Sequence, residues 1–193
     1  MPITISERDR GRAVSTVTLA FALDPVIRWL YQDTADYLTY WPRFVEAYGG
    51  GAIASRAGHA TEDFSGVALW LPPGMSPDED RVAELLHAAA ESERRADVDA
   101  ALEEMDGHHP TSAHYYLTLA GVDPMLQGRG IGSSLLRAGL DRCDEQQLPA
   151  YLEATSPGSR DLYSRHGFKE LGVIQNGAMP PMWPMLREPA RGA

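Results

Sequence analysis

The sequence predicts an α/β fold in which one mixed β-sheet carries helices on both faces. Short apolar runs alternate along the chain with longer amphipathic segments, and this alternation places helices against a sheet. The chain has 193 residues, of which 44% are hydrophobic, so it can bury one core without disulfides. Internal repeats are absent, and the Pro- and Gly-rich stretches are short enough to be turns. We therefore expect one domain over residues 1–193.

Composition and charge argue against several classes of function. A net charge of −10 does not suit nucleic acid, whose phosphates are neutralised by clustered Lys and Arg side chains. No window approaches the roughly 18 consecutive apolar residues of a membrane span, and residues 1–18 lack the apolar core of a secretory signal. The lone Cys143 excludes an internal disulfide. We expect a cytoplasmic protein with no nucleic-acid or membrane partner.

The N-terminal region is predicted to hold a strand, a helix and a pair of strands. Residues 14–21 contain β-branched side chains, which favour a strand, and Asp24-Pro25 after them suits the start of a helix. Aromatic and leucine side chains at three- and four-residue spacing predict a helix over 25–48, and the triple glycine at 49–51 is expected to end it. Apolar runs at 52–55 and 65–71 then predict the strand pair.

The middle of the chain is predicted to alternate helix and strand. Residues 78–105 are rich in Ala, Glu, Leu and Arg, which favours helix, and the Gly-His-His-Pro sequence at 107–110 is expected to break it. Bulky residues then predict a strand at 115–122. An amphipathic helix follows at 131–146, and a second strand at 150–154.

The C-terminal region is predicted to form a short helix and a terminal hairpin. Pro157 suits the first position of a helix, with Thr155 or Ser156 as its cap, and Gly167 suits its end. The hairpin is expected around 177–185.

A glycine-rich loop between the strand at 115–122 and the helix at 131–146 predicts an anion-binding site. The first turn of that helix has backbone N–H groups without partners and a partial positive charge. Glycines at 128, 130 and 132 let an anion approach those groups closely. A P-loop would need a Gly-Lys pair, but the one lysine is Lys169; a dinucleotide fingerprint would need the spacing G-x-G-x-x-G.

The pattern Gln127-x-x-Gly130-x-Gly132 after a strand resembles the Q/R-x-x-G-x-G/A signature of the GNAT superfamily of N-acetyltransferases. Other segments resemble landmarks of its puromycin N-acetyltransferase-like branch: Ala20-Phe21-Ala22-Leu23-Asp24-Pro25, Val67-Ala68-Leu69-Trp70, Tyr151-Leu152-Glu153-Ala154 and Leu162-Tyr163-Ser164-Arg165-His166-Gly167-Phe168. The likeness covers about 15–188 and is strongest over 115–170. It implies the GNAT-like acyl-CoA N-acyltransferase fold, acetyl-CoA (coenzyme A) as co-substrate, and direct transfer of acetyl to a small primary amine in a ternary complex.

The resemblance also implies which residues hold the cofactor. Family members splay two strands apart to admit pantetheine, and Gly121 suits a distortion of the strand near Ala120-Gly121. Many relatives have Asn near the start of the short helix, where this chain has Ser159. The cofactor-binding residues implied are Leu119, Ala120, Val122, Gln127, Gly128, Arg129, Gly130, Ile131, Gly132, Ser133 and Ser159.

Tyr163 is the candidate general acid, because it stands where the family places that acid. A phenol can donate a proton to the leaving thiolate. The alternative is that its ring only packs in the core.

The candidate general base is Glu153, with His114 or ordered water as alternatives. Some relatives carry a glutamate on the strand before the loop, but Tyr116 stands at that position. Glu153 lies in an apolar strand, so burial is expected to raise its pKa and suit it to base chemistry. It could equally be a structural carboxylate bonded to backbone amides.

Several further features leave alternatives open. His108-His109 lacks Cys or carboxylate partners at ligand spacing, so no metal is expected. Arg129 either contacts phosphate or faces solvent. Four aromatic residues on the N-terminal helix either line an acceptor pocket or pack in the core: Trp29, Tyr31, Tyr37 and Trp41. A homodimer is left open, as are a non-catalytic acyl-CoA sensor and a protein or peptide N-acetyltransferase.

Overall fold

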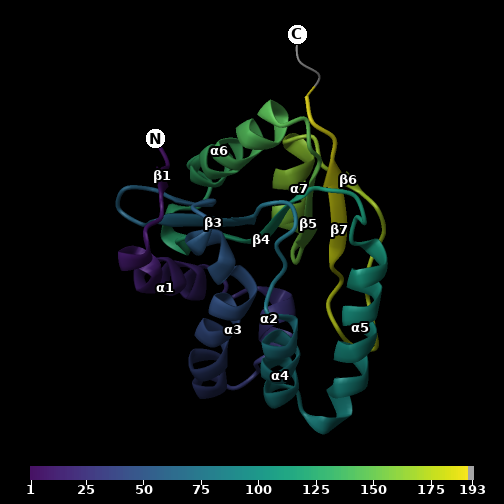
Figure 1. Cartoon of the computed structure of the whole chain (residues 1–193). Helices are drawn as coiled ribbons and strands as arrows, with labels where there is room; N and C mark the ends of the chain where they lie inside the picture. Colours follow the sequence, from purple (N-terminus) through teal and green to yellow (C-terminus); the bar gives the residue numbers. More distant parts are fainter. Residues whose placement is uncertain (191–193) are drawn as a thin grey trace.

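The computed structural model describes residues 1–190 and, within them, places one mixed seven-stranded sheet between helices (Figure 1). The strands lie in the order β1-β2-β3-β4-β5-β7-β6. Pairing is parallel between β4 and β5 and antiparallel between the other neighbours. The strands are β1 (Ile3–Thr4), β2 (Gly58–Ala60), β3 (Gly66–Leu71), β4 (Tyr115–Val122), β5 (Ala150–Ala154), β6 (Lys169–Glu170) and β7 (Trp183–Arg187). The mixed α/β fold predicted from the sequence is confirmed.

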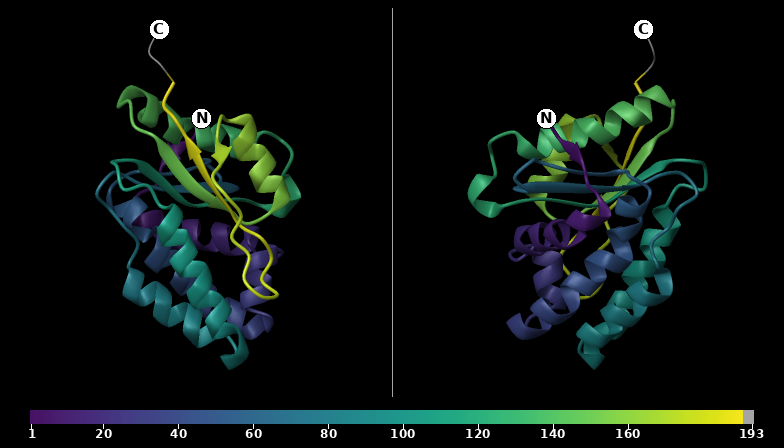
Figure 2. Two further views of the ribbon diagram at one scale, coloured as in Figure 1. Left: turned by 90° about the vertical axis from the view of Figure 1, so that its right-hand side faces the viewer. Right: turned by 60° about the vertical axis from the view of Figure 1, so that its left-hand side comes forward.

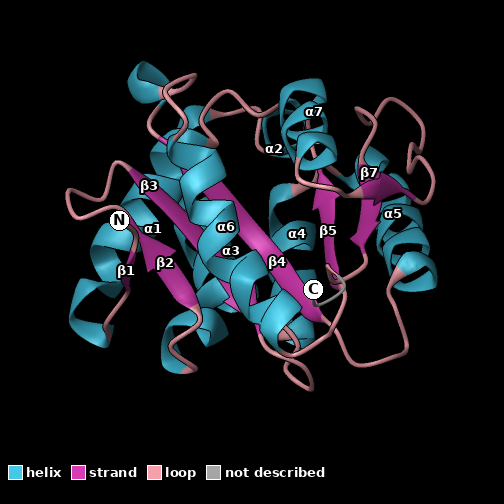
Figure 3. Ribbon diagram, turned by 90° about the horizontal axis from the view of Figure 1, so that it is seen from above, coloured by secondary structure: helices cyan, strands magenta, loops and turns pink. Residues whose placement is uncertain are grey.

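Helices cover both faces of this sheet (Figures 2 and 3). The α-helices are α1 (Arg10–Ala20), α2 (Pro25–Leu30), α3 (Thr34–Ala54), α4 (Glu79–Ala89), α5 (Arg95–His108), α6 (Ile131–Glu145) and α7 (Pro157–Arg165). Single 3₁₀ turns are η1 (Glu7–Asp9), η2 (Ser92–Arg94) and η3 (Pro124–Leu126). Helices α1 to α5 lie on one side, and α6 and α7 on the other. Within residues 1–190, no helix is both long and apolar enough to cross a bilayer.

Alternate side chains of β3 build the two cores. Leu69 and Leu71 pack toward α3, whereas Trp70 packs toward α6, as the two-residue period of a strand requires. Gly139 allows α6 to lie close to the sheet. A Cβ atom at this glycine would lie 2.2 Å from Nε1 of Trp70. This close packing holds α6 against the sheet and so helps to position its N-terminus.

The strand predicted over residues 14–21 is wrong, because this segment belongs to helix α1. Its β-branched residues are accommodated in two ways. Ala13 and Val17, four residues apart, are fully buried on one helical face. The hydroxyls of Thr16 and Thr18 donate to carbonyl groups four residues earlier, which satisfies them within the helix. Burial therefore outweighs the weak strand preference of these residues.

The glycines at 49–51 do not end the helix, and the strand predicted at 52–55 is also wrong. Helix α3 continues to Ala54, and the strand begins later, at Gly58. The glycines serve close packing instead. A Cβ atom at Gly49 would lie 2.6 Å from Cδ1 of Leu69. Glycines that would otherwise indicate a turn are therefore used here to let the helix pack closely against the sheet.

The single helix predicted over 78–105 is two helices. Helices α4 and α5 are separated by the 3₁₀ turn η2. Helix α5 ends at His108, within the Gly-His-His-Pro sequence that was predicted to break it. Composition favoured helix throughout this segment, but it carried no signal for the turn between the two.

The elements around the glycine-rich loop are confirmed. Strands β4 and β5 have the predicted bounds, and α6 begins at the predicted residue. Ser156, rather than Thr155, caps α7, because its Oγ accepts the N–H of Ser159. Gly167 follows this helix with a φ of 90°, which glycine adopts readily. Antiparallel pairing of Ile174 with Met182 confirms the terminal hairpin.

Strands β4 and β5 diverge, but the distortion of β4 lies elsewhere than predicted. They pair only where Tyr115 meets Ala150 and Tyr116 meets Tyr151. The register of β4 with β3 shifts between Leu117 and Leu119, so the extra residue is Thr118, not Ala120 or Gly121. Gly121 has a different role, since a Cβ atom there would lie 2.6 Å from Cβ of Ala20.

Candidate active site

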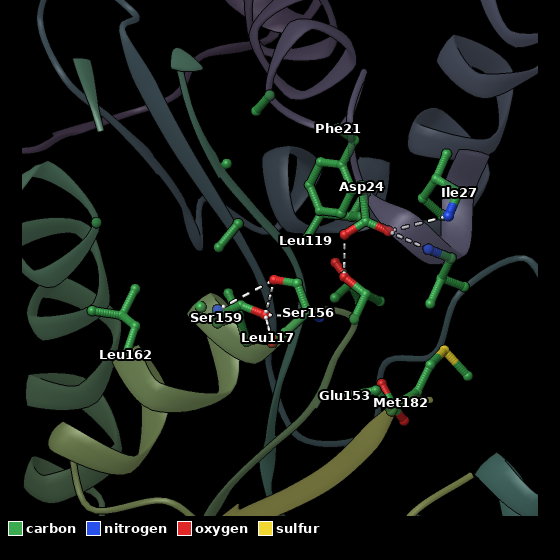
Figure 4. A pocket seen from close by; sticks show the side chains of 18 of the residues that line it. Phe21, Asp24, Ile27, Leu117, Leu119, Glu153, Ser156, Ser159, Leu162 and Met182 are labelled. Atoms are coloured by element: carbon green, nitrogen blue, oxygen red, sulfur yellow. Dashed lines mark hydrogen bonds between the residues drawn. The ribbon is translucent and has the colours of Figure 1, made fainter. Parts of the chain in front are cut away.

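A cavity of about 650 Å³ lies where β4 and β5 diverge. One side of it is formed by β4, the glycine-rich loop, the first turn of α6 and helix α7. The opposite side is formed by helices α2 to α5 and by the C-terminal hairpin. Figure 4 shows the two sides meeting near Asp24 and Ser156. A single cavity is therefore lined both by the glycine-rich loop with its neighbouring elements and by the helices and hairpin on the opposite side.

The first turn of α6 faces this cavity with free backbone donors. Gly130 is the N-cap and has a φ of 82°, and Gly128 has a φ of 75°. No side chain among residues 1–190 caps the helix. Seven residues of the loop and first turn line the cavity: Leu126, Gln127, Gly128, Gly130, Ile131, Gly132 and Ser133. Uncapped amides and the helix dipole suit a phosphate group here.

The side chain of Gln127 links the two ends of the segment between β4 and the glycine run. Its Nε2 donates to the carbonyl oxygen of Val122 at 3.2 Å, which ties the end of β4 to the start of the glycine run. Leu119, Ala120 and Val122 line the cavity from the stretch of β4 that has lost its pairing with β5. A strand edge with open backbone groups can pair with an extended amide-containing chain.

Two residues predicted to contact the cofactor, Ser159 and Arg129, have surroundings that the sequence did not indicate. Ser159 lines the cavity, but its Oγ accepts the N–H of Ser156 at 3.2 Å in a capping box and donates to the carbonyl oxygen of Ser156 at 2.9 Å. Arg129 is exposed and lies outside the cavity lining. Arg165, which the sequence did not single out, lines the cavity from the last turn of α7. The sequence did not indicate that this arginine would line the cavity.

Tyr163 both packs in the core and lines the cavity, so the two interpretations of the sequence are compatible. Its side chain is buried and its ring meets the edge of Phe168 at a centroid distance of 5.9 Å. Burial raises the pKa of Tyr163 above its ordinary value, and the negative charge of Asp24 adds to this. The phenol thus stays protonated near neutral pH and can act as a proton donor.

Glu153 enters the cavity from β5 with one oxygen free. The hydroxyl of Tyr116 donates to Oε2 at 2.7 Å, and the hydroxyl of Tyr48 contacts that of Tyr116. Oε1 is buried and has no hydrogen-bond partner among residues 1–190. Burial raises the pKa of Glu153 to about 7, and the hydroxyls of Tyr116 and Tyr151 oppose the rise. A carboxylate titrating near neutral pH is suited to accept a proton.

His114, the alternative base, is not brought to this cavity. Its Nε2 contacts Nε2 of His109 at 2.9 Å, and it lines a separate surface hollow with Met75 and Pro110. Tyr116 stands at the position of the family's glutamate and instead presents its hydroxyl to Glu153. The carboxylate in this chain thus comes from the neighbouring strand.

Asp24 lies on the cavity wall, although the sequence indicated only its role at a helix start. Its Oδ1 accepts the N–H groups of Val26 and Ile27 at 3.0 and 3.1 Å and caps α2. Its Oδ2 accepts the hydroxyl of Thr155, which anchors α2 to the end of β5 (Figure 4). Burial raises the pKa of Asp24, and these hydrogen bonds lower it. Both carboxylate oxygens are occupied, so Asp24 orders the wall.

The four aromatic residues divide between the two predicted roles. Trp29 and Trp41 line the cavity. Tyr31 and Tyr37 are buried in the core beside Trp41, with ring centroids 6.2 Å from it. Cys143 is also fully buried, and burial raises the pKa of its thiol to about 12. This thiol is therefore unsuited to carry an acyl group.

Among residues 1–190, no group of three or more His, Cys, Asp or Glu side chains is arranged to hold a metal ion. The expectation that the protein works without a metal stays a prediction.

Comparison with known proteins identifies the family. Residues 82–188 match the model of the acetyltransferase (GNAT) domain. The chain therefore belongs to the GNAT acetyltransferase family and is an N-acetyltransferase. Enzymes of this family use acetyl-CoA as acyl donor.

Individual relatives agree with this assignment. The chain is 25% identical over 210 residues to an uncharacterized N-acetyltransferase of Schizosaccharomyces pombe, covering 96% of this chain and 82% of that protein. It is similar to a Corynebacterium glutamicum structure described as histone acetyltransferase HPA2 and related acetyltransferase, with 26% identity, a TM-score of 0.68 and coverage of 100% and 98%. A polyamine N-acetyltransferase of Drosophila melanogaster shares the fold at 13% identity, with a TM-score of 0.63 and coverage of 97% and 99%.

Proposed function

We propose that this enzyme transfers acetyl from acetyl-CoA directly to the primary amine of a small molecule in a ternary complex. The single observation that carries the proposal is that one cavity joins the uncapped α6 terminus to Tyr163 and Glu153. The glycine cradle and free amides fit the diphosphate of coenzyme A, and the unpaired edge of β4 fits its pantetheine arm. We further propose that the enzyme belongs to the puromycin N-acetyltransferase-like branch, because four segments of its sequence resemble landmarks of that branch.

The proposed coenzyme A contacts follow the lining of the cavity. Leu119, Ala120 and Val122 take the pantetheine arm through their backbone groups, and the loop and first turn from Gln127 to Ser133 take the diphosphate. Ser159 and Arg165 add polar groups at α7, while Arg129 is a candidate contact from the outer side of the loop.

The acceptor amine has to lose a proton before it can attack, and we propose that Glu153 accepts this proton. An alkylamine with a pKa near 10.4 holds its proton at pH 7, and removing it costs roughly 4.6 kcal/mol. The free Oε1 of Glu153 is the acceptor we propose for that proton. The buried Tyr116 hydroxyl on Oε2 stabilises the charged carboxylate so that it remains available as a base.

Tyr163 and Glu153 together account for the protons that move during acetyl transfer. The nitrogen lone pair forms a bond to the acetyl carbon, the carbon–sulfur bond breaks, and Tyr163 gives its proton to the sulfur. Of the two protons that the ammonium loses, one restores Tyr163 and the other leaves through Glu153 to solvent. Burial that raises the pKa of Tyr163 also makes a thiolate beside it a stronger base, so proton transfer is not prevented.

Thiol release from acetyl-CoA across a panel of primary amines tests this function. We expect turnover by the parent and its near loss in Tyr163→Phe, which keeps the ring. Tyr40→Phe is the matched control, since Tyr40 lies on α3 outside the cavity lining. Coenzyme A binding without turnover of any amine would contradict the proposal and favour a sensor. Faster acetylation of lysine peptides than of small amines would favour a protein N-acetyltransferase.

A further inference from the structure

The acceptor side of the cavity is almost entirely apolar. Its walls come from helices α2 to α5 and the C-terminal hairpin, and most of the side chains they contribute are aliphatic, thioether or aromatic. Six of them are Trp29, Leu86, Leu102, Met105, Met179 and Met182. Helices α4 and α5 are rich in charged residues, yet the residues they place on this wall are Val82, Leu86, Val98, Ala101, Leu102 and Met105. A long apolar wall of this kind binds apolar groups and disfavours charges.

Trp29 is held in place on this wall. The Arg94 guanidinium donates to the carbonyl oxygen of Trp29 at 2.8 Å and lies 5.5 Å from the centre of its indole ring. The arginine thus anchors α2 to the start of α5 from outside the cavity. The apolar face of Trp29 is thereby a fixed surface of the site.

The acceptor side offers one place for a positive charge. Asp24 and Glu153 are the two carboxylates in the lining described within residues 1–190. Both oxygens of Asp24 already accept hydrogen bonds from α2 and Thr155. Glu153 keeps Oε1 unpartnered. Glu153 is therefore the carboxylate whose free oxygen can pair an ammonium group, and a second cation on the wall formed by α4, α5 and the hairpin would meet apolar side chains.

We propose that the acceptor is a monocationic amine with an apolar body, such as an arylalkylamine, and that diamines and polyamines are poor substrates. This inference rests on the proposed function, because the ammonium at Glu153 is the group acetylated. The apolar body lies against Trp29, Met105 and Met182. A distal charge must lose its hydration without gaining a partner, so discrimination against diamines is about 100-fold or more.

Three amines with the same four-carbon spacer test the preference: butylamine, 4-phenylbutylamine and 1,4-diaminobutane. We expect kcat/KM to be highest for 4-phenylbutylamine and at least about 100-fold lower for 1,4-diaminobutane. Met105→Glu places a carboxylate on the apolar wall. We expect it to reduce the ratio of kcat/KM for 4-phenylbutylamine to kcat/KM for 1,4-diaminobutane by about tenfold or more. Met105→Gln is the matched uncharged control and should leave diaminobutane poor.

Calorimetry with the same amines separates failure of this inference from failure of the proposed function. Equal kcat/KM for 1,4-diaminobutane and 4-phenylbutylamine would overturn the inference and leave the transferase function intact. Tight binding of 4-phenylbutylamine over diaminobutane without any acetylation would overturn the transferase function and retain the apolar, monocationic preference of the cavity. Failure to bind or acetylate any of the three would overturn both.

Discussion

The two sides of the cavity offer different chemical groups, so each suits a different kind of ligand. On the side proposed to bind coenzyme A, backbone amides of one loop and one helix turn face the cavity, and glycines keep them accessible. On the opposite side, where we propose that the acceptor amine binds, the wall is formed mostly by apolar side chains of helices α2 to α5 and the C-terminal hairpin. Backbone recognition tolerates sequence change, whereas a side-chain wall changes its specificity with each substitution. Substitutions on one side should therefore affect one substrate and leave the other nearly unaffected.

The largest effect is expected where the two sides meet, at Tyr163. Tyr163→Phe should lower kcat by about 10²- to 10⁴-fold with every amine, because it removes the proton donor and keeps the buried ring. Steady-state kinetics and coenzyme A titration check this. The affinity for coenzyme A should stay within about twofold of the parent. A uniform loss of coenzyme A affinity with unchanged kcat would place Tyr163 in binding instead.

Glu153→Gln should lower kcat/KM by about 100-fold and alter its pH dependence. Because the pKa of Glu153 is raised to about 7, the parent should gain activity as pH rises through about 7, when the carboxylate becomes ionised. The variant should lack this rising limb. A pH profile of kcat/KM from 5 to 9 checks it, and an unchanged limb in the variant would exclude Glu153 as the base.

The same carboxylate affects stability. Since folding raises the pKa of Glu153, its neutral form favours the folded state, and this contribution is full below the ordinary glutamate value near 4.5. It declines as pH rises toward about 7. Glu153→Gln should therefore raise Tm more at pH 8 than at pH 5, which thermal unfolding at the two pH values measures. An equal shift at both would contradict the raised pKa.

On the coenzyme A side, Gly130→Ala should weaken coenzyme A binding by about tenfold. A side chain at a φ of 82° costs roughly 1–2 kcal/mol, and the new Cβ atom projects into open space at the α6 terminus. The KM for the amine should change little. Calorimetric titration of coenzyme A measures the effect, and a parallel loss of amine affinity would show that the two sides are not independent.

The smallest effect is expected for Gly107→Ala, a glycine-to-alanine change remote from the loop. Gly107 lies within α5, and a Cβ atom there meets no heavy atom within 4 Å. The variant should gain about 0.5–1 kcal/mol of stability from helix propensity alone. Denaturant unfolding measures this. Reduced coenzyme A binding in this variant would undermine the local interpretation of Gly130→Ala.

The coenzyme A side could be predicted from the sequence because it is local. Its strand β4, the loop and α6 are contiguous in the chain, and the spacing of Gln127, Gly130 and Gly132 is informative without knowledge of the fold. Glu153 and Tyr163 were likewise placed in the cavity as expected. Their chemical roles remain predictions.

The acceptor side could not be predicted because long-range packing creates it. The hairpin and the helices before residue 50 do line the cavity, but the contributions of α4 and α5 carried no sequence signal. Helix α1 was taken for a strand because Thr and Val favour strands locally, while burial of Ala13 and Val17 decides the outcome. Asp24 was visible only as a helix start, and Arg165 not at all.

Titration of coenzyme A into the parent protein by calorimetry tests the central claim most directly. The claim is that the uncapped first turn of α6 holds the diphosphate of this cofactor. It predicts saturable heat with one coenzyme A bound per chain. Absence of heat at millimolar coenzyme A, with the protein shown to be folded, would contradict it.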